Sequence, residues 1–215
     1  MKSTTVVSSR PQQFLLYEAD WKQYDQFRRS LDDRGQRAFI TFDGHRIELM
    51  SPSLEHDRAG ELIGQLVRAI AKATQTEYIS GGSTTFKRRD LQRGLETDKC
   101  FWIQNQAKIH GVKRIDLRVH PAPDLVIEVE VSRRLLDRKS IYARLGVPEI
   151  WVYNRKTFRM LELGDEHEYR PKQKSAIFPM IRFAGVERLL QRAGNIGELE
   201  WQTVLEKWVR KAIVD

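Results

Sequence analysis

Hydrophobic and polar side chains alternate with a period of two along residues 124–131, which is the pattern of a β-strand. One face is aliphatic and carries Leu125, Ile127, Val129 and Val131. The other face carries three carboxylates and one valine: Asp124, Val126, Glu128 and Glu130. Like charges on one strand face repel, so a divalent cation that prefers oxygen ligands would stabilise this face. The solvent-facing side of an edge strand would explain the same pattern.

Apolar residues at helical spacing predict helices over residues 18–34, 51–74, 133–145 and 196–213. The second would begin with Ser51 as its capping residue and Pro52 at its first position. Glu55 and His56 flank its apolar stripe and so face the body of the protein, whereas Glu61 points away. Both could serve a site, or they could simply occupy the helix N-terminus, where Glu55 complements the helix dipole.

The helix over 133–145 should bury Leu135, Leu136, Ile141, Tyr142 and Leu145. Gly146 is placed to end this helix in a left-handed conformation. The last helix carries two tryptophans on its stripe, which indicates core or dimer packing. Homodimerisation is therefore one expectation from the sequence.

Strands are expected between these helices. Residues 37–42 and 45–50 flank the turn pair Asp43-Gly44 and predict a hairpin. Further strands are expected over residues 77–86, 95–103 and 149–154. The first is interrupted at Gly81-Gly82, and in the second Glu96 and Asp98 would share a face. Residues 158–162 and 168–169 suggest a second hairpin. The order predicts an α/β fold with a mixed central sheet flanked by helices, an N-terminal hairpin and a C-terminal helix.

The length and composition fit one domain. We expect residues 1–13 to form a disordered tail and 14–215 to form the domain, with a helical extension over 186–215. Cys100 is the only cysteine, which excludes an internal disulfide and argues against an all-cysteine zinc site. No apolar run approaches the ~18 residues of a membrane span, and the N-terminus lacks a signal-peptide core. These features predict a cytoplasmic protein.

The formal net charge is +8, which favours polyanionic partners and above all nucleic acid. Four cations lie close together in a segment expected to be an exposed loop over residues 87–94, and we predict that they bind nucleic acid: Lys87, Arg88, Arg89 and Arg93. A basic protein with an acidic strand face is typical of a nuclease.

Several linked segments carry a more specific signal: residues 45–52 followed by Glu55-His56, then 81–86, 94–103, 123–129 and 141–151. In this order they resemble the Uma-two family, which belongs to the restriction-endonuclease-like superfamily with the signature PD-(D/E)xK. The resemblance covers about residues 37–160. It implies a restriction-endonuclease-like fold and cleavage of DNA with Mg²⁺ or Mn²⁺.

The resemblance also implies roles for individual residues. Asp98 and Glu128 would hold the metal ion, and Thr97 replaces the proline of the PD element. Glu130 stands where the superfamily usually has lysine, and it could join the metal site. Arg138 sits where that lysine is found in branches that carry it on the following helix, with Lys139 adjacent.

Four further residues are candidates for supporting roles. Glu48, Glu55 and His56 could complete the acidic cluster or orient water. Asp124 lies four residues from Glu128, roughly 13 Å along the strand, so we expect it to cap or pair locally.

Three functions remain open from the sequence. The first is a metal-dependent DNA endonuclease. The second is a catalytically weak or inactive protein of the nuclease fold that binds nucleic acid or assembles with a partner, an alternative that the missing lysine at position 130 favours. The third is a metal-dependent hydrolase of small phosphoesters.

Overall fold

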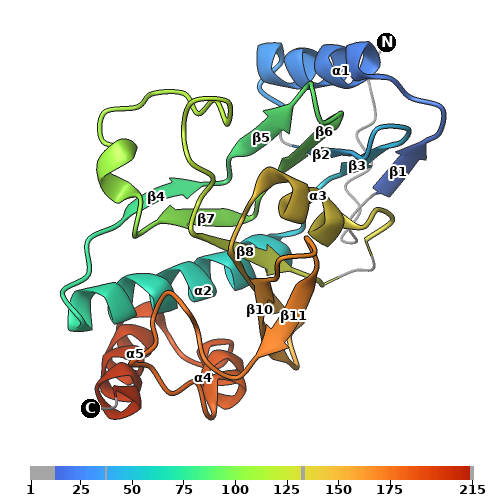
Figure 1. The fold of residues 1–215 in the computed structure, drawn as a ribbon. Coiled ribbons are helices and arrows are strands. Elements are labelled where there is room, and N and C mark those ends of the chain that lie inside the picture. The colour runs from blue at the N-terminus through green and yellow to red at the C-terminus, as the bar shows by residue number, and fades with distance from the viewer. Residues whose placement is uncertain (1–12, 37, 132–133, 214–215) are drawn as a thin grey trace, which may run out of the picture.

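The structure is a computed structural model that describes residues 13–36, 38–131 and 134–213. It contains two sheets with helices packed around them (Figure 1). Apart from Gln13, the tail predicted over residues 1–13 lies outside the described residues. Within the described part of the chain, no helix is long and apolar enough to cross a membrane.

The five-stranded sheet is antiparallel throughout, in the order β1-β3-β2-β6-β5. Its strands are β1 (Gln13–Leu16), β2 (Phe39–Phe42), β3 (Ile47–Met50), β5 (Thr85–Arg88) and β6 (Arg93–Glu96). The predicted hairpin around Asp43-Gly44 is confirmed as β2 and β3. The Asp43 carboxylate accepts from the backbone N–H groups of residues 45 and 46, which fixes the tight connection.

The six-stranded sheet has the order β11-β10-β9-β8-β7-β4. Its strands are β4 (Ile79–Gly82), β7 (Lys99–Trp102), β8 (Leu125–Val129), β9 (Glu149–Tyr153), β10 (Phe158–Leu163) and β11 (Tyr169–Lys172). Only β8 and β9 pair in parallel. Because β8 lies between β7 and β9, the alternative of a solvent-facing edge strand is wrong.

Two segments that we expected to be continuous strands each cross from one sheet to the other. Residues 77–86 contain β4 and β5, and residues 95–103 contain the end of β6 and all of β7. A backbone bond from Thr97 to the Thr84 carbonyl joins the two crossings. Glu96 and Asp98 therefore do not share one strand face. The expected loop over 87–94 is largely the β5–β6 hairpin.

The helices are α1 (Trp21–Asp33), α2 (Leu54–Ala73), α3 (Arg138–Leu145), α4 (Val186–Ala193) and α5 (Glu198–Ala212), with a short 3₁₀ turn, η1 (Gln106–Lys108). Helices α2, α4 and α5 pack together on one side of the six-stranded sheet (Figure 1). The aliphatic face of β8 is buried in that core, and Val126 on its other face packs in the core of α3. The predicted alternation along β8 is confirmed.

The C-terminal tryptophans belong to the core. Trp201 is fully buried in the cluster of α2, α4 and α5, and Trp208 packs partly buried against the same cluster. Of the two roles considered for them, core packing is the one that the structure shows.

Helix α2 begins later than predicted. Its capping residue is Ser53 rather than Ser51, and the Ser53 hydroxyl accepts from the His56 backbone N–H at 3.2 Å. We expect Ser53→Ala to lower the free energy of unfolding by about 1 kcal/mol, because an N–H of the first turn loses its acceptor. Urea denaturation would measure this effect. Ser51→Ala is the matched control, and an equal loss in both variants would contradict the assignment of the cap.

Helix α3 begins at Arg138, five residues later than predicted, because the Asp137 carboxylate caps the N–H groups of Lys139 and Ser140. Residue 133, the expected start, lies outside the described residues. Leu135 precedes the helix and is 42% exposed, so its predicted burial is wrong; the other four predicted positions are buried. Gly146 ends the helix at φ 78°, as predicted.

Candidate functional site

A buried ion pair between β8 and α3 forms the centre of the site. Arg138 binds Glu128 through two parallel bonds, Nε to Oε2 at 2.8 Å and Nη2 to Oε1 at 2.7 Å. The residues are 4% and 5% exposed. The local sequence explains this geometry, because α3 follows β8 after a short connection and turns its first residue towards the strand. Such a bidentate pair fixes the orientation of the carboxylate as well as its charge.

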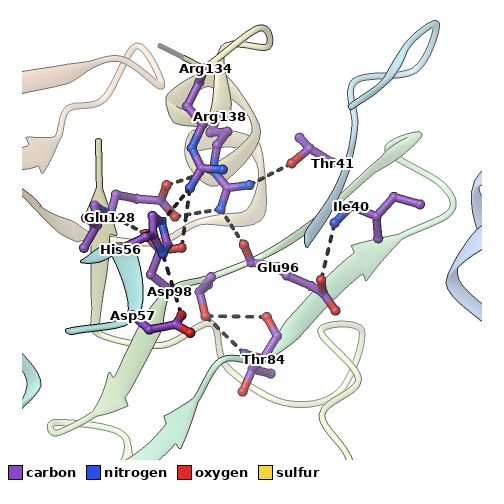
Figure 2. Close-up of polar contacts among 12 residues, drawn as sticks. Ile40, Thr41, His56, Asp57, Thr84, Glu96, Asp98, Glu128, Arg134 and Arg138 are labelled. Atoms are coloured by element: carbon purple, nitrogen blue, oxygen red, sulfur yellow. Dashed lines mark hydrogen bonds and ion pairs between the residues drawn. The ribbon is translucent and has the colours of Figure 1, made fainter. Parts of the chain in front are cut away.

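The other donors of Arg138 also have partners (Figure 2). Nη1 donates to Thr41 Oγ1 at 2.7 Å, and Nη2 donates to the Glu96 carbonyl and lies 3.1 Å from the Tyr142 hydroxyl. Arg138 thereby ties both sheets and α3 together. Burial lowers its pKa, but the charge of Glu128 outweighs this effect and raises the pKa well above the usual value.

Tyr142 completes the surroundings of Glu128. Its hydroxyl donates to Glu128 Oε1 from one turn further along α3. Burial, and next the charge of Glu128, raise the pKa of Tyr142 well above its usual value, so the phenol stays protonated. The two donors on Oε1 leave Glu128 Oε2 with a single described partner, Arg138.

Asp98 lies at the crossing between β6 and β7. Its Oδ2 accepts from the Val129 backbone N–H at 2.6 Å and lies 3.2 Å from His56 Nε2, whereas Oδ1 has a long contact of 3.5 Å to Arg134 Nη2. Burial opposes ionisation. The hydrogen bond from His56 and the charges of Arg134 and Arg138 outweigh burial and lower the pKa of Asp98 from 3.8 to about 2. The group is therefore a carboxylate at neutral pH.

His56 projects from the first turn of α2 towards Asp98 (Figure 2). Its Nε2 lies between Asp98 Oδ2 and Arg134 Nη2, which is 3.3 Å away. One ring nitrogen cannot donate to the first and accept from the second, and the ionised Asp98 can only accept. The geometry therefore favours a proton on Nε2. The Nδ1 atom is buried and has no hydrogen-bond partner among the residues that the structure describes.

Two cavities flank the carboxylates. Glu128 lines one of about 540 Å³, together with Glu130, Arg134, Arg138 and Lys139. Asp98 and His56 line the other, of about 410 Å³. Arg134 lines the first cavity and contacts Asp98 and His56, which line the second.

Several predicted residues lie in a network of two clusters: Glu128 with Arg138, and Asp98 with His56 and Arg134. Among the described residues, no side-chain hydrogen bond or ion pair joins the two clusters, but the charge of Arg138 acts on Asp98. Glu48 borders the network from β3. Its Oε1 accepts from the Leu135 N–H at 2.9 Å, and its Oε2 is buried with no hydrogen-bond partner in the described part of the chain. Lys139 and Glu130 reach the cavity of Glu128.

Two candidates have other roles. Asp124 accepts from two backbone N–H groups, those of Ile103 and Asn105, so it braces the end of β7 as its distance along the strand suggested. Glu55 pairs with Arg155 at the surface, and both side chains are more than half exposed, so the prediction that Glu55 faces the body of the protein is wrong. Glu96, expected beside Asp98, turns its carboxylate towards Arg28 and Thr85.

The predicted nucleic-acid-binding cations are divided. Lys87, Arg88 and Arg89 line one cavity at the end of the β5–β6 hairpin. Arg93 does not line that cavity, and its guanidinium donates to the Gln92 carbonyl at 2.9 Å.

Sequence reasoning missed three members of the network: Thr41, Arg134 and Tyr142. Tyr142 was expected only as a buried residue, although its spacing of four from Arg138 places both on one face of α3. Thr41 and Arg134 gave no signal, because their contacts with Arg138 and Asp98 join segments far apart in the chain.

The donors present suit a divalent metal ion of the kind that the resemblance implied. An ionised carboxylate has about four acceptor sites, and both Asp98 and Glu128 keep one oxygen with a single described contact. Magnesium typically binds through one or two carboxylates and keeps several waters. Among the described residues, no three acidic, histidine or cysteine side chains are grouped to hold a metal. A magnesium ion at this site would therefore be held by the two carboxylates and by water, and not by a cage of protein ligands.

Comparison with known proteins adds one match. A family model named Uma2, with the description "putative restriction endonuclease", matches residues 21–183. This range includes both sheets except β1, and every residue of the network described above. No curated protein matches the chain.

Proposed function

The chain belongs to the Uma2 family, and from that membership and the geometry of the site we propose that it is a metal-dependent endonuclease that hydrolyses phosphodiester bonds in DNA. The observation that supports this most directly is the pair of buried carboxylates, Asp98 and Glu128. Asp98 directly precedes β7 and Glu128 lies on the neighbouring strand β8, and the charge of Arg138 acts on both carboxylates.

Asp98 and Glu128 would hold Mg²⁺ or Mn²⁺. When bound, the ion would polarise a phosphodiester oxygen and make a water molecule more acidic. The chain's own residues prepare this site. Val129 and His56 orient Asp98, and Arg138 and Tyr142 orient Glu128. Such fixed dipoles and charges cost little reorganisation when charge develops on a phosphate.

Lys139 is the cation that we assign to the substrate phosphate. Arg138 has a protein acceptor for each of its three nitrogens, so it acts as a positioning residue for Glu128. Lys139 lines the same cavity as Glu128, and no ion pair with another described residue is present for its side chain. A lysine ammonium is a compact charge on a flexible stem and can approach a phosphate there.

A second candidate function is nucleic-acid binding without cleavage. The observation that favours it is the substitution at position 130, where Glu130 pairs with Arg159 at 3.0 Å and adds negative charge beside the cavity. Homodimerisation and a cytoplasmic location stay predictions from the sequence.

Cleavage of supercoiled plasmid and of single-stranded DNA, with Mg²⁺, with Mn²⁺ and with EDTA, tests the proposal. We expect cutting with either metal and none with EDTA. Binding to DNA without cutting under both metals would overturn the enzyme and support the second candidate. Turnover of a model phosphodiester with no cutting of DNA would instead support a hydrolase of small phosphoesters.

A further inference from the structure

A third cavity, of about 900 Å³, lies beside the five-stranded sheet and shares no lining residue with the two cavities at the carboxylates. It is formed where α1, the end of the β5–β6 hairpin and the connection before β8 meet (Figure 1). Five cations line it: Lys87, Arg88, Arg89, Arg114 and Arg118. We call it the basic groove. Its two arginines from residues 114–118 are separated from the hairpin in sequence and join it only through the fold.

One ion pair and one hydrogen bond join the walls of the basic groove, and two further ion pairs lie within its walls. Lys87 reaches across to Asp25 on α1 at 2.7 Å. Arg88 pairs with Asp90 and also donates to the Leu117 carbonyl at 3.2 Å, which ties the hairpin to the opposite wall. Arg118 pairs with Asp116 within that wall. The groove is thus a built feature of the fold rather than a chance gathering of surface side chains.

Two of the five cations that line the groove take no part in these three ion pairs. Arg89 and Arg114 are exposed, and neither forms an ion pair with any described residue. The three acids of the lining, Asp25, Asp90 and Asp116, match only three of the five cations. The groove consequently carries a surplus of two positive charges on long side chains that can reach an anion. Guanidinium groups with free donors suit the oxygens of phosphates in particular.

The β5–β6 hairpin connects the basic groove with the catalytic site. Arg88 and Arg93 pair at the groove end of the hairpin, and Thr85 and Glu96 pair at the other end. The Glu96 carbonyl there accepts from Arg138. These two residue pairs are three positions apart along the strand, which is about 10 Å. One DNA strand covers that length in about three base steps.

We infer that the basic groove holds the sugar–phosphate backbone of duplex DNA a few base steps from the bond that is cut, with Arg89 and Arg114 as its phosphate ligands. The inference rests on the proposed function for its choice of DNA as the ligand. Contacts of this kind position the duplex and carry no sequence information. The groove would therefore determine the affinity of the protein for DNA and the position of the duplex relative to the site of cleavage.

The test measures binding of the full chain to a fluorescein-labelled duplex oligonucleotide in EDTA, by anisotropy, across about 50–200 mM KCl. For the double variant Arg89→Ala and Arg114→Ala we expect weaker binding at every salt concentration. We also expect the slope of log K against log salt to become shallower by about two, since each lost phosphate contact removes about 0.9 from it. Far-UV circular dichroism checks that the variant folds.

A matched control removes the same charge elsewhere. Arg188→Ala with Arg210→Ala, on α4 and α5, deletes two exposed arginines and should leave the salt slope within about half a unit of the original. A further variant, Asp90→Asn, releases Arg88 and should tighten binding, a gain that misfolding cannot produce. Equal slopes for the double variant and its control would overturn the inference.

Failure of the groove and failure of the proposed function give different results. If the groove variant loses binding but the parent protein never cuts with either metal, the groove binds DNA and the proposed nuclease activity is wrong. If the parent cuts DNA and the groove variant binds and cuts like the control, the nuclease activity is supported and the role of the groove in DNA binding is wrong.

Discussion

Replacing Arg138 with methionine is expected to lower the free energy of unfolding by about 3–5 kcal/mol. Arg138 is 4% exposed and forms a bidentate pair with Glu128, which is 5% exposed. Methionine retains much of the buried aliphatic volume but leaves the Glu128 carboxylate without its cation, and an unpaired buried charge is costly. Urea denaturation at neutral pH would measure the loss.

The matched control is Arg159→Met. Arg159 also pairs with a glutamate, Glu130, at 3.0 Å, but its side chain is 45% exposed. Water and salt screen such a pair, so we expect a change of no more than about 1 kcal/mol. The double variant Glu128→Leu with Arg138→Met should recover much of the stability, because no charge is then buried alone. A loss for Arg138→Met as small as that of the control would show that the guanidinium is not held as the structure describes.

Replacing Asp98 with asparagine is expected to reduce the rate of DNA cleavage by at least about a hundredfold. The substitution keeps the shape and an oxygen for the Val129 N–H, but it removes the charge that would hold the metal, and metal catalysis contributes several kcal/mol. Single-turnover cleavage with saturating enzyme would measure the effect. Binding of DNA in EDTA should be unchanged or tighter, since a negative charge is lost.

Glu55→Gln is the control for this second prediction, because Glu55 lies on the surface and pairs with Arg155 away from the network. It should cleave at the parent rate. A cleavage rate for Asp98→Asn within about tenfold of the parent would place the metal elsewhere.

The same variant has a consequence for acid stability. The pKa of Asp98 lies below its ordinary value, so the carboxylate stabilises the folded state above about pH 3.8 and this stabilisation is lost as the pH falls through about 2. Asp98→Asn should lack that part of the acid transition. Urea midpoints compared at pH 7 and pH 3 would detect the difference.

Much of the local structure could be predicted because it depends on neighbours in the chain. The alternation over residues 124–131 identified β8 and separated its two faces. Asp43-Gly44 predicted the β2–β3 hairpin, and Gly146 predicted the end of α3. In each case the decisive contacts lie within a few residues, so the pattern and the structure follow from the same local sterics.

Sheet membership could not be predicted in the same way. Residues 95–103 are apolar enough to be one buried strand, and periodicity does not indicate which sheet a strand joins. The crossing at Thr97 and Asp98 arises from pairing with residues more than ten positions away, on Thr84 for one side and on β8 for the other. This crossing is also what frees the Asp98 carboxylate from a strand face and turns it towards His56.

The sequence by itself determined the family and most helices and strands, and the family resemblance suggested Asp98 and Glu128 as the acidic pair. Only the tertiary structure decided how those carboxylates are held. Arg138 could have been a free cation for a phosphate, but the fold surrounds it with Glu128, Thr41 and the Glu96 carbonyl and gives each of its nitrogens an acceptor within the protein. The reason is physical: a guanidinium buried with a carboxylate must satisfy its donors within the protein, and the partners that do so come from segments that no local pattern connects.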